Sequence, residues 1–218
     1  MNFIELFTYY APTFNEALIL TLQLTIVSLI CASILGIIFG MFSIAHNKVL
    51  NIISSIYVDI IRGTPLIVQV FIMYYGVGGT ILRPVFGISW NDLGGVFTAG
   101  CIALSLNAGA YMAEIVRGGI ESVDKGQMEA ARSLGLTYGK AMRKVILPQA
   151  IRTMLPSIIN QFIISLKDTS LISVIGIRKL TMNARMISAN ESAGVLYVYV
   201  IAAIYYLVIC TILSKVAK

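Results

Sequence analysis

The chain has 218 residues, of which 58% are hydrophobic and only 12% are charged, with a formal net charge of +6. Soluble domains carry about 25% charged residues and about 45–50% apolar residues. The composition therefore excludes a disordered chain, a basic nucleic-acid-binding domain and an ordinary soluble enzyme. A mean hydropathy of +0.87 predicts a protein that needs lipid as its solvent.

The few residues suited to covalent or metal chemistry are scattered. The three cysteines, Cys31, Cys101 and Cys210, lie in apolar runs and are expected to be buried free thiols. His46 is the only histidine, which excludes paired-histidine zinc sites and histidine-activated nucleophiles. We predict no catalytic residue and no metal site. The N-terminus lacks Lys or Arg before the first apolar run, so no cleaved signal peptide is expected.

Five stretches are apolar enough to span a membrane, because a spanning helix needs roughly 20 mainly apolar residues. In chain order they are residues 17–44, 52–75, 96–116, 154–175 and 195–213. The sequence therefore predicts an all-α membrane protein with about five transmembrane helices. All of residues 1–218 form one transmembrane domain in this prediction, with the termini on opposite sides.

Basic residues orient these spans, because cytoplasmic loops carry the excess of Lys and Arg. The 117–153 connection holds seven of them, and with Lys48, Lys215 and Lys218 its side has ten. The other side has four: Arg83, Arg178, Lys179 and Arg185. This predicts a cytoplasmic 117–153 loop and C-terminus and an external N-terminus. Trp90, in an external loop, is expected to anchor at the membrane interface.

Two short helices are predicted inside the cytoplasmic loop. Ser122 or Asp124 can cap the first, over residues 127–134, and Gly135 suits a left-handed residue just beyond it. The second covers residues 140–145.

The second loop helix has its own boundary signals. Thr137 can cap it, and Pro148 is expected to discourage its continuation. A basic amphipathic pair of this kind either lies on the lipid surface or docks into a partner. The small residues Ala130, Ala131 and Gly135 favour close approach to another protein.

The second span is interrupted by Arg62, Gly63, Thr64 and Pro65. Pro65 removes a backbone donor and is expected to kink the helix, and such breaks need cover from protein or a water-filled cavity. The segment is either a flexing element beside a translocation path or a helix entry at the cytoplasmic interface. In the second case Arg62 snorkels and pairs with Asp59 or another acid.

Polar residues recur on one face of the third span. Asn107, Tyr111 and Glu114 are spaced i, i+4 and i+7, which puts them on one side of a helix. They either line a cavity or bond to neighbouring helices. Glu114 can also pair with Arg117, three residues on.

The fourth span carries a similar stripe. Gln161, Ser165 and Asp168 share one face, and Asn160 and Lys167 are their neighbours. Lys167 could bind a substrate carboxylate and Asp168 an α-amino group. Alternatively, each charge has a structural partner elsewhere, because adjacent helical residues do not face each other.

Four separated motifs resemble a known family. The spacing Glu129-Ala130-Ala131, Gly135, Val145 and Leu147-Pro148 is similar to the EAA loop of ABC-importer permeases. Three other motifs resemble the polar amino acid branch of that family, with glutamine-type permeases the nearest. They are Arg62-Gly63-Thr64-Pro65-Leu66 with Gln69, Asn107 to Tyr111 with Glu114, and Lys167-Asp168-Thr169-Ser170-Leu171. The resemblance covers about residues 21–176.

The resemblance implies roles for these residues. Those expected to couple to an ATPase are Glu129, Ala130, Ala131, Gly135, Leu147 and Pro148. Those expected along the substrate path are Gln69, Asn107, Tyr111, Asn160, Gln161, Lys167 and Asp168. The helix break at residues 62–65 is expected to flex beside that path.

The resemblance also implies partners. The chain has no Walker motif, so ATP with magnesium is expected in separate ATPase subunits and no cofactor in this chain. A second permease copy or a similar permease is expected to complete the path as a dimer, and an extracytoplasmic binding protein to deliver the substrate. The implied location is the bacterial cell membrane, with lipid and an amino acid as ligands and no nucleic acid.

Rival functions remain at this point. An intramembrane enzyme would need paired acids or a Ser/His set, and no span holds a histidine. An ion-coupled carrier usually shows inverted repeats, and none is visible. A channel subunit and a permease for another small polar solute are also compatible with these features.

Overall fold

The computed structural model describes residues 2–190 and 194–216, and within these ranges every regular element is a helix. In chain order the elements are α1 (Phe3–Ser43), α2 (Lys48–Arg62), α3 (Leu66–Phe71), the π-helix η1 (Ile72–Leu82), α4 (Arg83–Phe86), the 3-10 helix η2 (Trp90–Leu93), α5 (Gly95–Glu121), α6 (Lys125–Ser133), α7 (Tyr138–Ala141), the π-helix η3 (Met142–Ile146), α8 (Leu147–Asp168), the 3-10 helix η4 (Thr169–Ile175), α9 (Leu180–Asn190) and α10 (Val195–Val216).

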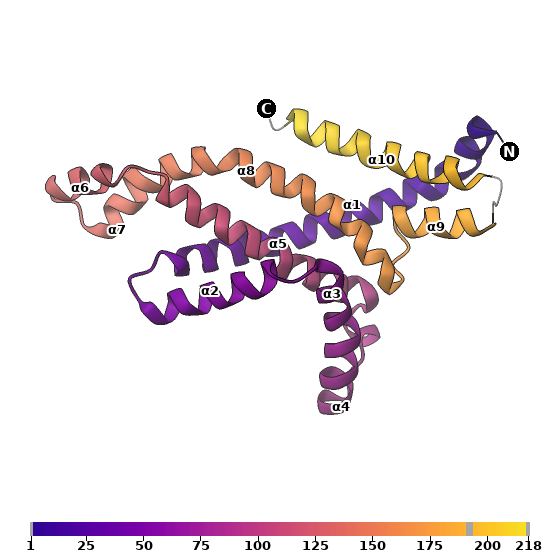
Figure 1. Ribbon diagram of the computed structural model, residues 1–218, viewed down its shortest axis with the longest axis horizontal. Coiled ribbons are helices and arrows are strands. Elements are labelled where there is room, and N and C mark those ends of the chain that lie inside the picture. Colours follow the sequence, from indigo (N-terminus) through magenta and orange to yellow (C-terminus); the bar gives the residue numbers. More distant parts are fainter. Residues whose placement is uncertain (1, 191–193, 217–218) are drawn as a thin grey trace.

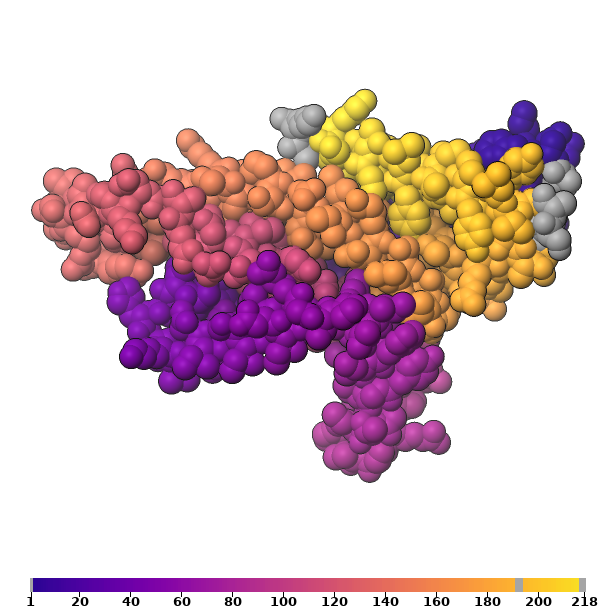
Figure 2. All heavy atoms as spheres, in the orientation of Figure 1, coloured from indigo at the N-terminus to yellow at the C-terminus, as the bar shows by residue number. Residues whose placement is uncertain are grey.

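Helices α1, α5, α8 and α10 run lengthwise, with α5 between its neighbours (Figure 1). Helix α2 turns back beside α1, and the α6–α7 loop lies at the end opposite the N-terminus. The run Leu66–Phe86, which we call the arm, projects crosswise from this body (Figure 2).

Five helical runs in the described part of the chain are long and apolar enough to cross a membrane: Phe3–Ser43, Leu66–Phe86, Gly95–Glu121, Tyr138–Ile175 and Val195–Lys215. The predicted fold class is confirmed. The predicted second span, residues 52–75, is wrong, because it joins two separate helices. Helix α2 ends at Arg62, and Pro65 begins the next run in an extended conformation. The residue before a proline avoids the helical region, so the chain breaks instead of kinking.

Small residues let α1 and α5 approach closely. An added Cβ at Gly40 would lie 2.7 Å from the Cβ of Val116, and one at Gly109 would lie 2.9 Å from the Cβ of Leu35. Close backbone approach of this kind is how helices associate in lipid, where the solvent offers no hydrophobic driving force between them. This contact fixes α5 as the central helix of the body.

The predicted stop at Pro148 is also wrong. Helices α7, η3, α8 and η4 form one run, Tyr138–Ile175, and Pro148 lies in the first turn of α8. The π-helix Met142–Ile146 directly precedes it. Because proline is tolerated in a first turn, and because a π-turn changes the carbonyl pairing there, the helix continues.

Two further expectations need correction. Cys31 is exposed on α1, and Cys210 is half-buried, although all three cysteines are free and Cys101 is buried. Trp90 is buried instead of anchoring at an interface. Its indole N–H donates to the carbonyl of Tyr74 at 2.9 Å, which ties the segment after α4 back onto the arm.

Candidate functional site

A cavity of about 590 Å³ opens where the break between α2 and α3 meets α5 and α8. Most of its lining residues are polar, and four helices, α2, α3, α5 and α8, contribute to it. The lining residues are Arg62, Gly63, Thr64, Pro65, Leu66, Asn107, Tyr111, Gln161, Ile164 and Asp168. All four predicted helix-break residues and four of the predicted path residues therefore meet at one cavity.

The helix break is held open by Gln69. Its amide nitrogen donates to the carbonyls of Ile61 (2.6 Å) and Thr64 (3.0 Å) and to the Thr64 hydroxyl (2.8 Å). Its amide oxygen accepts from Asn107 on α5 at 3.0 Å. Gln69, predicted along the path, thus satisfies backbone carbonyls freed by the break and ties the break to α5.

Arg62 lies at the edge of the cavity on the last turn of α2. Its guanidinium forms an ion pair with Glu114 at 3.0 Å and lies 5.4 Å from the ring centre of Tyr111. Its partner is therefore Glu114, one of the acids left open by the sequence. Asp59 instead accepts a hydrogen bond from Ser55 at 3.1 Å. With 42% of its side chain exposed, Arg62 keeps donors free for a ligand.

Asp168 and Lys167 point to different places, although they are adjacent. Asp168 lines the cavity and forms no hydrogen bond or ion pair within the described part of the chain, although the charge of Lys167 acts on its carboxylate. Lys167 lines a separate groove with Tyr206 and Cys210 of α10. Both residues were expected along the substrate path, and the structure puts Asp168 at this cavity and Lys167 outside it, because adjacent residues on a helix do not share a face.

The other path residues predicted on α8, Asn160 and Gln161, also line different cavities. Gln161 is buried, lines the cavity and donates to Ser165 at 3.4 Å. Asn160 is exposed and lines a neighbouring hollow of about 470 Å³ with Arg62. Ile164 was missed by sequence reasoning, although its place between Gln161 and Asp168 on the same face could have found it.

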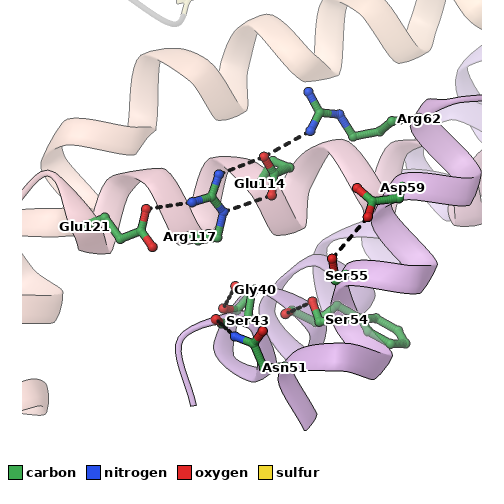
Figure 3. Close-up of polar contacts among 11 residues, drawn as sticks. Gly40, Ser43, Asn51, Ser54, Ser55, Asp59, Arg62, Glu114, Arg117 and Glu121 are labelled. Carbon is green, nitrogen blue, oxygen red and sulfur yellow. Dashed lines mark hydrogen bonds and ion pairs between the residues drawn. The ribbon is translucent and has the colours of Figure 1, made fainter. Parts of the chain in front are cut away.

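A ladder of charges continues from Arg62 along α5 (Figure 3). The Glu114 carboxylate accepts two hydrogen bonds of 3.0 Å from Arg117, and Arg117 also donates to Glu121 at 2.7 Å. These four side chains, which we call the charge ladder, line a second cavity of about 390 Å³ together with Asp59. The predicted pairing of Glu114 with Arg117 is confirmed, and the ladder ends at the last residue of α5.

The first predicted helix of the 117–153 loop is present as α6, which begins two residues earlier and ends one residue earlier than the predicted range 127–134. Asp124 caps α6 by accepting from the backbone of Gly126 at 2.7 Å. Gly135 has a φ of +83°, its N–H donates to Arg132, and the N–H of Leu136 donates to Ala131. This pair of hydrogen bonds is a Schellman motif, which needs the left-handed residue that glycine supplies. Thr137 begins α7 without a side-chain capping bond.

The outer surface of this loop is a mixture of charge and apolar surface. Glu129 and Ala130 are exposed, and Leu134 is 84% exposed at the tip. Ala131 is buried instead, packed inward from α6. Leu147 is half-buried and Pro148 exposed at the start of α8. An exposed leucine beside small and acidic residues is a surface suited to docking with another protein.

Comparison with known proteins agrees with this architecture. The sequence model of the family described as "Binding-protein-dependent transport system inner membrane component" matches residues 9–218. The chain therefore belongs to this family and is a membrane-embedded transport permease.

Individual relatives narrow the branch. The chain is 40% identical over 205 residues to the L-cystine transport system permease protein TcyB of Bacillus subtilis (strain 168), covering 94% of this chain and 83% of that protein. It is 36% identical over 208 residues to the glutamine transport system permease protein GlnP of Escherichia coli (strain K12), covering 95% and 90%.

Solved structures share the fold. A structure described as an amino acid ABC transporter with histidines has a TM-score of 0.88 and 39% identity, and the match covers 100% of this chain and 96% of that one. The MetNI methionine ABC transporter, at 19% identity and a TM-score of 0.69, shares the fold over 94% of each chain.

Proposed function

We propose that the chain is the permease subunit of an ABC importer for a polar amino acid, and that the cavity at the helix break contacts the substrate. The observation that carries this proposal is that Arg62 and Asp168 line the same cavity from different helices. One is a cation. The other is a carboxylate that forms no hydrogen bond or ion pair among the described residues, although the charge of Lys167 acts on it from a distance.

Those two charges suit the zwitterion that every free amino acid carries. A charged ligand leaving water needs an opposite charge and hydrogen bonds to replace its hydration. Arg62 can bind the α-carboxylate through two parallel N–H groups, and Asp168 can accept from the α-ammonium group. Asn107, Tyr111 and Gln161 add polar groups around them. These contacts address the backbone of the amino acid, so they do not choose among side chains.

The partners follow from surfaces that the chain leaves uncovered. Backbone at the helix break must be covered by protein or by a water-filled path at membrane depth, and a second permease copy supplies that cover. The exposed tip of the α6–α7 loop is the proposed dock for an ATPase that holds ATP and magnesium. An extracytoplasmic binding protein would deliver the amino acid at the opposite end.

In this proposal transport proceeds by alternating access. ATP-driven closure of two ATPases moves the α6–α7 loops, and α7, η3 and α8 form one run, so the movement reaches Gln161 and Asp168 directly. The loop and the C-terminus would be cytoplasmic and the N-terminus external in a bacterial cell membrane. The loop and the N-terminus lie at opposite ends of the molecule, in keeping with that orientation (Figure 1).

The site is tested by Asp168→Asn in the assembled transporter, with Asp59→Asn as the matched control outside the cavity. We expect Asp168→Asn to lower uptake of radiolabelled amino acid at least about tenfold, because the α-ammonium loses its counter-charge, and Asp59→Asn to retain it. Normal uptake by both Asp168→Asn and Arg62→Gln would refute the site.

The docking surface is tested separately by co-purification with the ATPase. Leu134→Glu should abolish recovery of the complex, whereas Gln149→Glu, an exposed change on the first turn of α8, should leave it intact. Equal recovery of both variants would remove the loop tip from the interface. Uptake that needs an ion gradient and no ATPase would instead favour an ion-coupled carrier.

A further inference from the structure

We infer that Glu114 is an occupancy-dependent latch that holds Arg62 while the cavity is empty and gives it up to the carboxylate of the substrate. This inference rests on the proposed function of the cavity. It adds a competing interaction within the chain that sets how tightly substrate is held.

The geometry places Arg62 between two cavities. It lines the cavity at the helix break, and it also lines the second cavity with Glu114, Arg117 and Glu121. Glu114 occupies one terminal nitrogen of its guanidinium at 3.0 Å. A carboxylate bound through two parallel N–H groups needs the guanidinium edge that this ion pair partly uses. The substrate and Glu114 therefore compete for Arg62.

The charge ladder allows Glu114 to release Arg62 without becoming a lone buried charge. Its carboxylate keeps both hydrogen bonds to Arg117, each 3.0 Å long. Arg117 is held in turn by Glu121 at 2.7 Å. A carboxylate with only one partner would resist release, because an unpaired charge away from water is costly. Figure 3 shows this continuous chain of contacts from Arg62 to Glu121.

Release would also loosen α2 from α5 beside the helix break. The Arg62–Glu114 pair joins the last residue of α2 to the C-terminal half of α5. Close by, Gln69 joins the first helix of the arm to Asn107 of α5. Substrate binding would thus open the Arg62–Glu114 tie. It would leave the Gln69–Asn107 bond and the 2.7 Å hydrogen bond from the Tyr57 hydroxyl of α2 to the Leu106 carbonyl of α5 in place. That makes the end of α2 the element that responds to occupancy.

The test measures equilibrium binding to the complete permease–ATPase complex in nanodiscs, with radiolabelled L-glutamine, L-arginine and L-cystine as probes. Glu114→Gln removes the competing charge and should tighten binding about two- to fivefold, the range expected for a partly exposed ion pair. A merely structural role for Glu114 would weaken binding instead. Asp59→Asn is the matched control, because Asp59 lines the same second cavity but accepts a hydrogen bond from Ser55 and does not pair with Arg62, and it should leave the affinity unchanged.

A double substitution separates the latch from simple repulsion of the substrate. In an Arg62→Gln background the tightening by Glu114→Gln should vanish, because there is no guanidinium to compete for. Unchanged or weaker binding by Glu114→Gln alone, or tightening that persists without Arg62, would overturn the latch. If no probe binds the unaltered complex, or if Arg62→Gln and Asp168→Asn both bind normally, the proposed function itself fails.

Discussion

Helix α5 and the arm are both glycine-rich apolar runs long enough to cross a membrane, but their surroundings are opposite. In the most apolar 18-residue stretch of α5, 67% of the residues are buried inside the chain. In the corresponding stretch of the arm, only 6% are buried. One glycine of each run illustrates the contrast, although Gly78 of the arm is itself packed against Trp90. A Cβ at Gly109 of α5 would strike Leu35, whereas one at Gly79 of the arm would meet nothing within 4 Å.

The difference teaches that apolar composition specifies lipid as the solvent without specifying a neighbour. In α5 the small residues meet larger side chains of α1, so packing is completed within one chain. The surface of the arm has to be covered by lipid or by another subunit. The following substitutions change one region and not the other.

The largest effect is expected where α1 and α5 are in closest contact. Gly40→Ala would place a methyl group 2.7 Å from Val116 and 2.9 Å from the carbonyl oxygen of Ala113, which is backbone and cannot rotate away. We expect about 3 kcal/mol of destabilisation and loss of assembled protein. Thermal unfolding in detergent measures it, with Gly79→Ala as the matched control expected to be neutral. A neutral Gly40→Ala would contradict the close packing.

A smaller effect is expected where the arm joins α5. Gln69→Leu leaves the carbonyls of Ile61 and Thr64 without their donor and breaks the bond to Asn107. The expected cost is about 2 kcal/mol, because three hydrogen bonds worth about 0.5–1.5 kcal/mol each are lost. Gln69→Glu is the informative companion, because it keeps the shape and loses the donors. If both variants unfold at the temperature of the unaltered chain, these bonds do not hold the break.

Lys179 is a buried lysine whose ammonium lies over the ring of Phe97, near the N-terminal end of α5. It is 1% exposed, and its ammonium has no hydrogen-bond partner within the described residues and lies 5.5 Å from the ring centre of Phe97. Burial lowers the pKa of Lys179 from 10.5 to about 7. Between those values the unfolded chain binds the proton more strongly, so stability rises as the pH rises from about 7 towards 10.5.

Replacing this lysine should therefore stabilise the protein. We expect Lys179→Met to raise the unfolding temperature by about 3 °C near pH 7, and this gain should shrink as the pH increases. Thermal unfolding at pH 7 and pH 9.5 checks both statements, with exposed Arg178→Met as the control. A gain that is independent of pH would mean that Lys179 does not change its proton affinity on folding.

The smallest effect is expected where the segment after α4 bonds back to the arm. Trp90→Phe keeps an aromatic ring but loses the 2.9 Å hydrogen bond to Tyr74. Because that bond ties the returning segment to an otherwise exposed run, we expect about 1 kcal/mol of local destabilisation. Hydrogen exchange should increase across residues 74–90 and remain unchanged in α5. Faster exchange in both regions would show that the arm and α5 unfold together.

Local signals in the sequence predicted much of the site. The helix break at residues 62–65 and the turn at Gly135 were found because proline and glycine restrict or free the backbone wherever they occur. The i, i+4, i+7 stripes identified Asn107, Tyr111, Gln161 and Asp168, which meet at one cavity. The prediction that the helix stops near Pro148 was wrong, because the π-helical turn before it cannot be recognised from the pattern of residue types.

The sequence by itself determined that the chain is a helical membrane protein with a cytoplasm-type basic loop and charged residues at a few defined helix positions. These follow from transfer into lipid and from backbone preferences, which act over a few residues. Only the tertiary structure decided that Arg62 pairs with Glu114, that Lys167 faces away from the cavity, and that the arm runs crosswise. Those depend on which helix faces pack together, and apolar helix faces look alike in sequence.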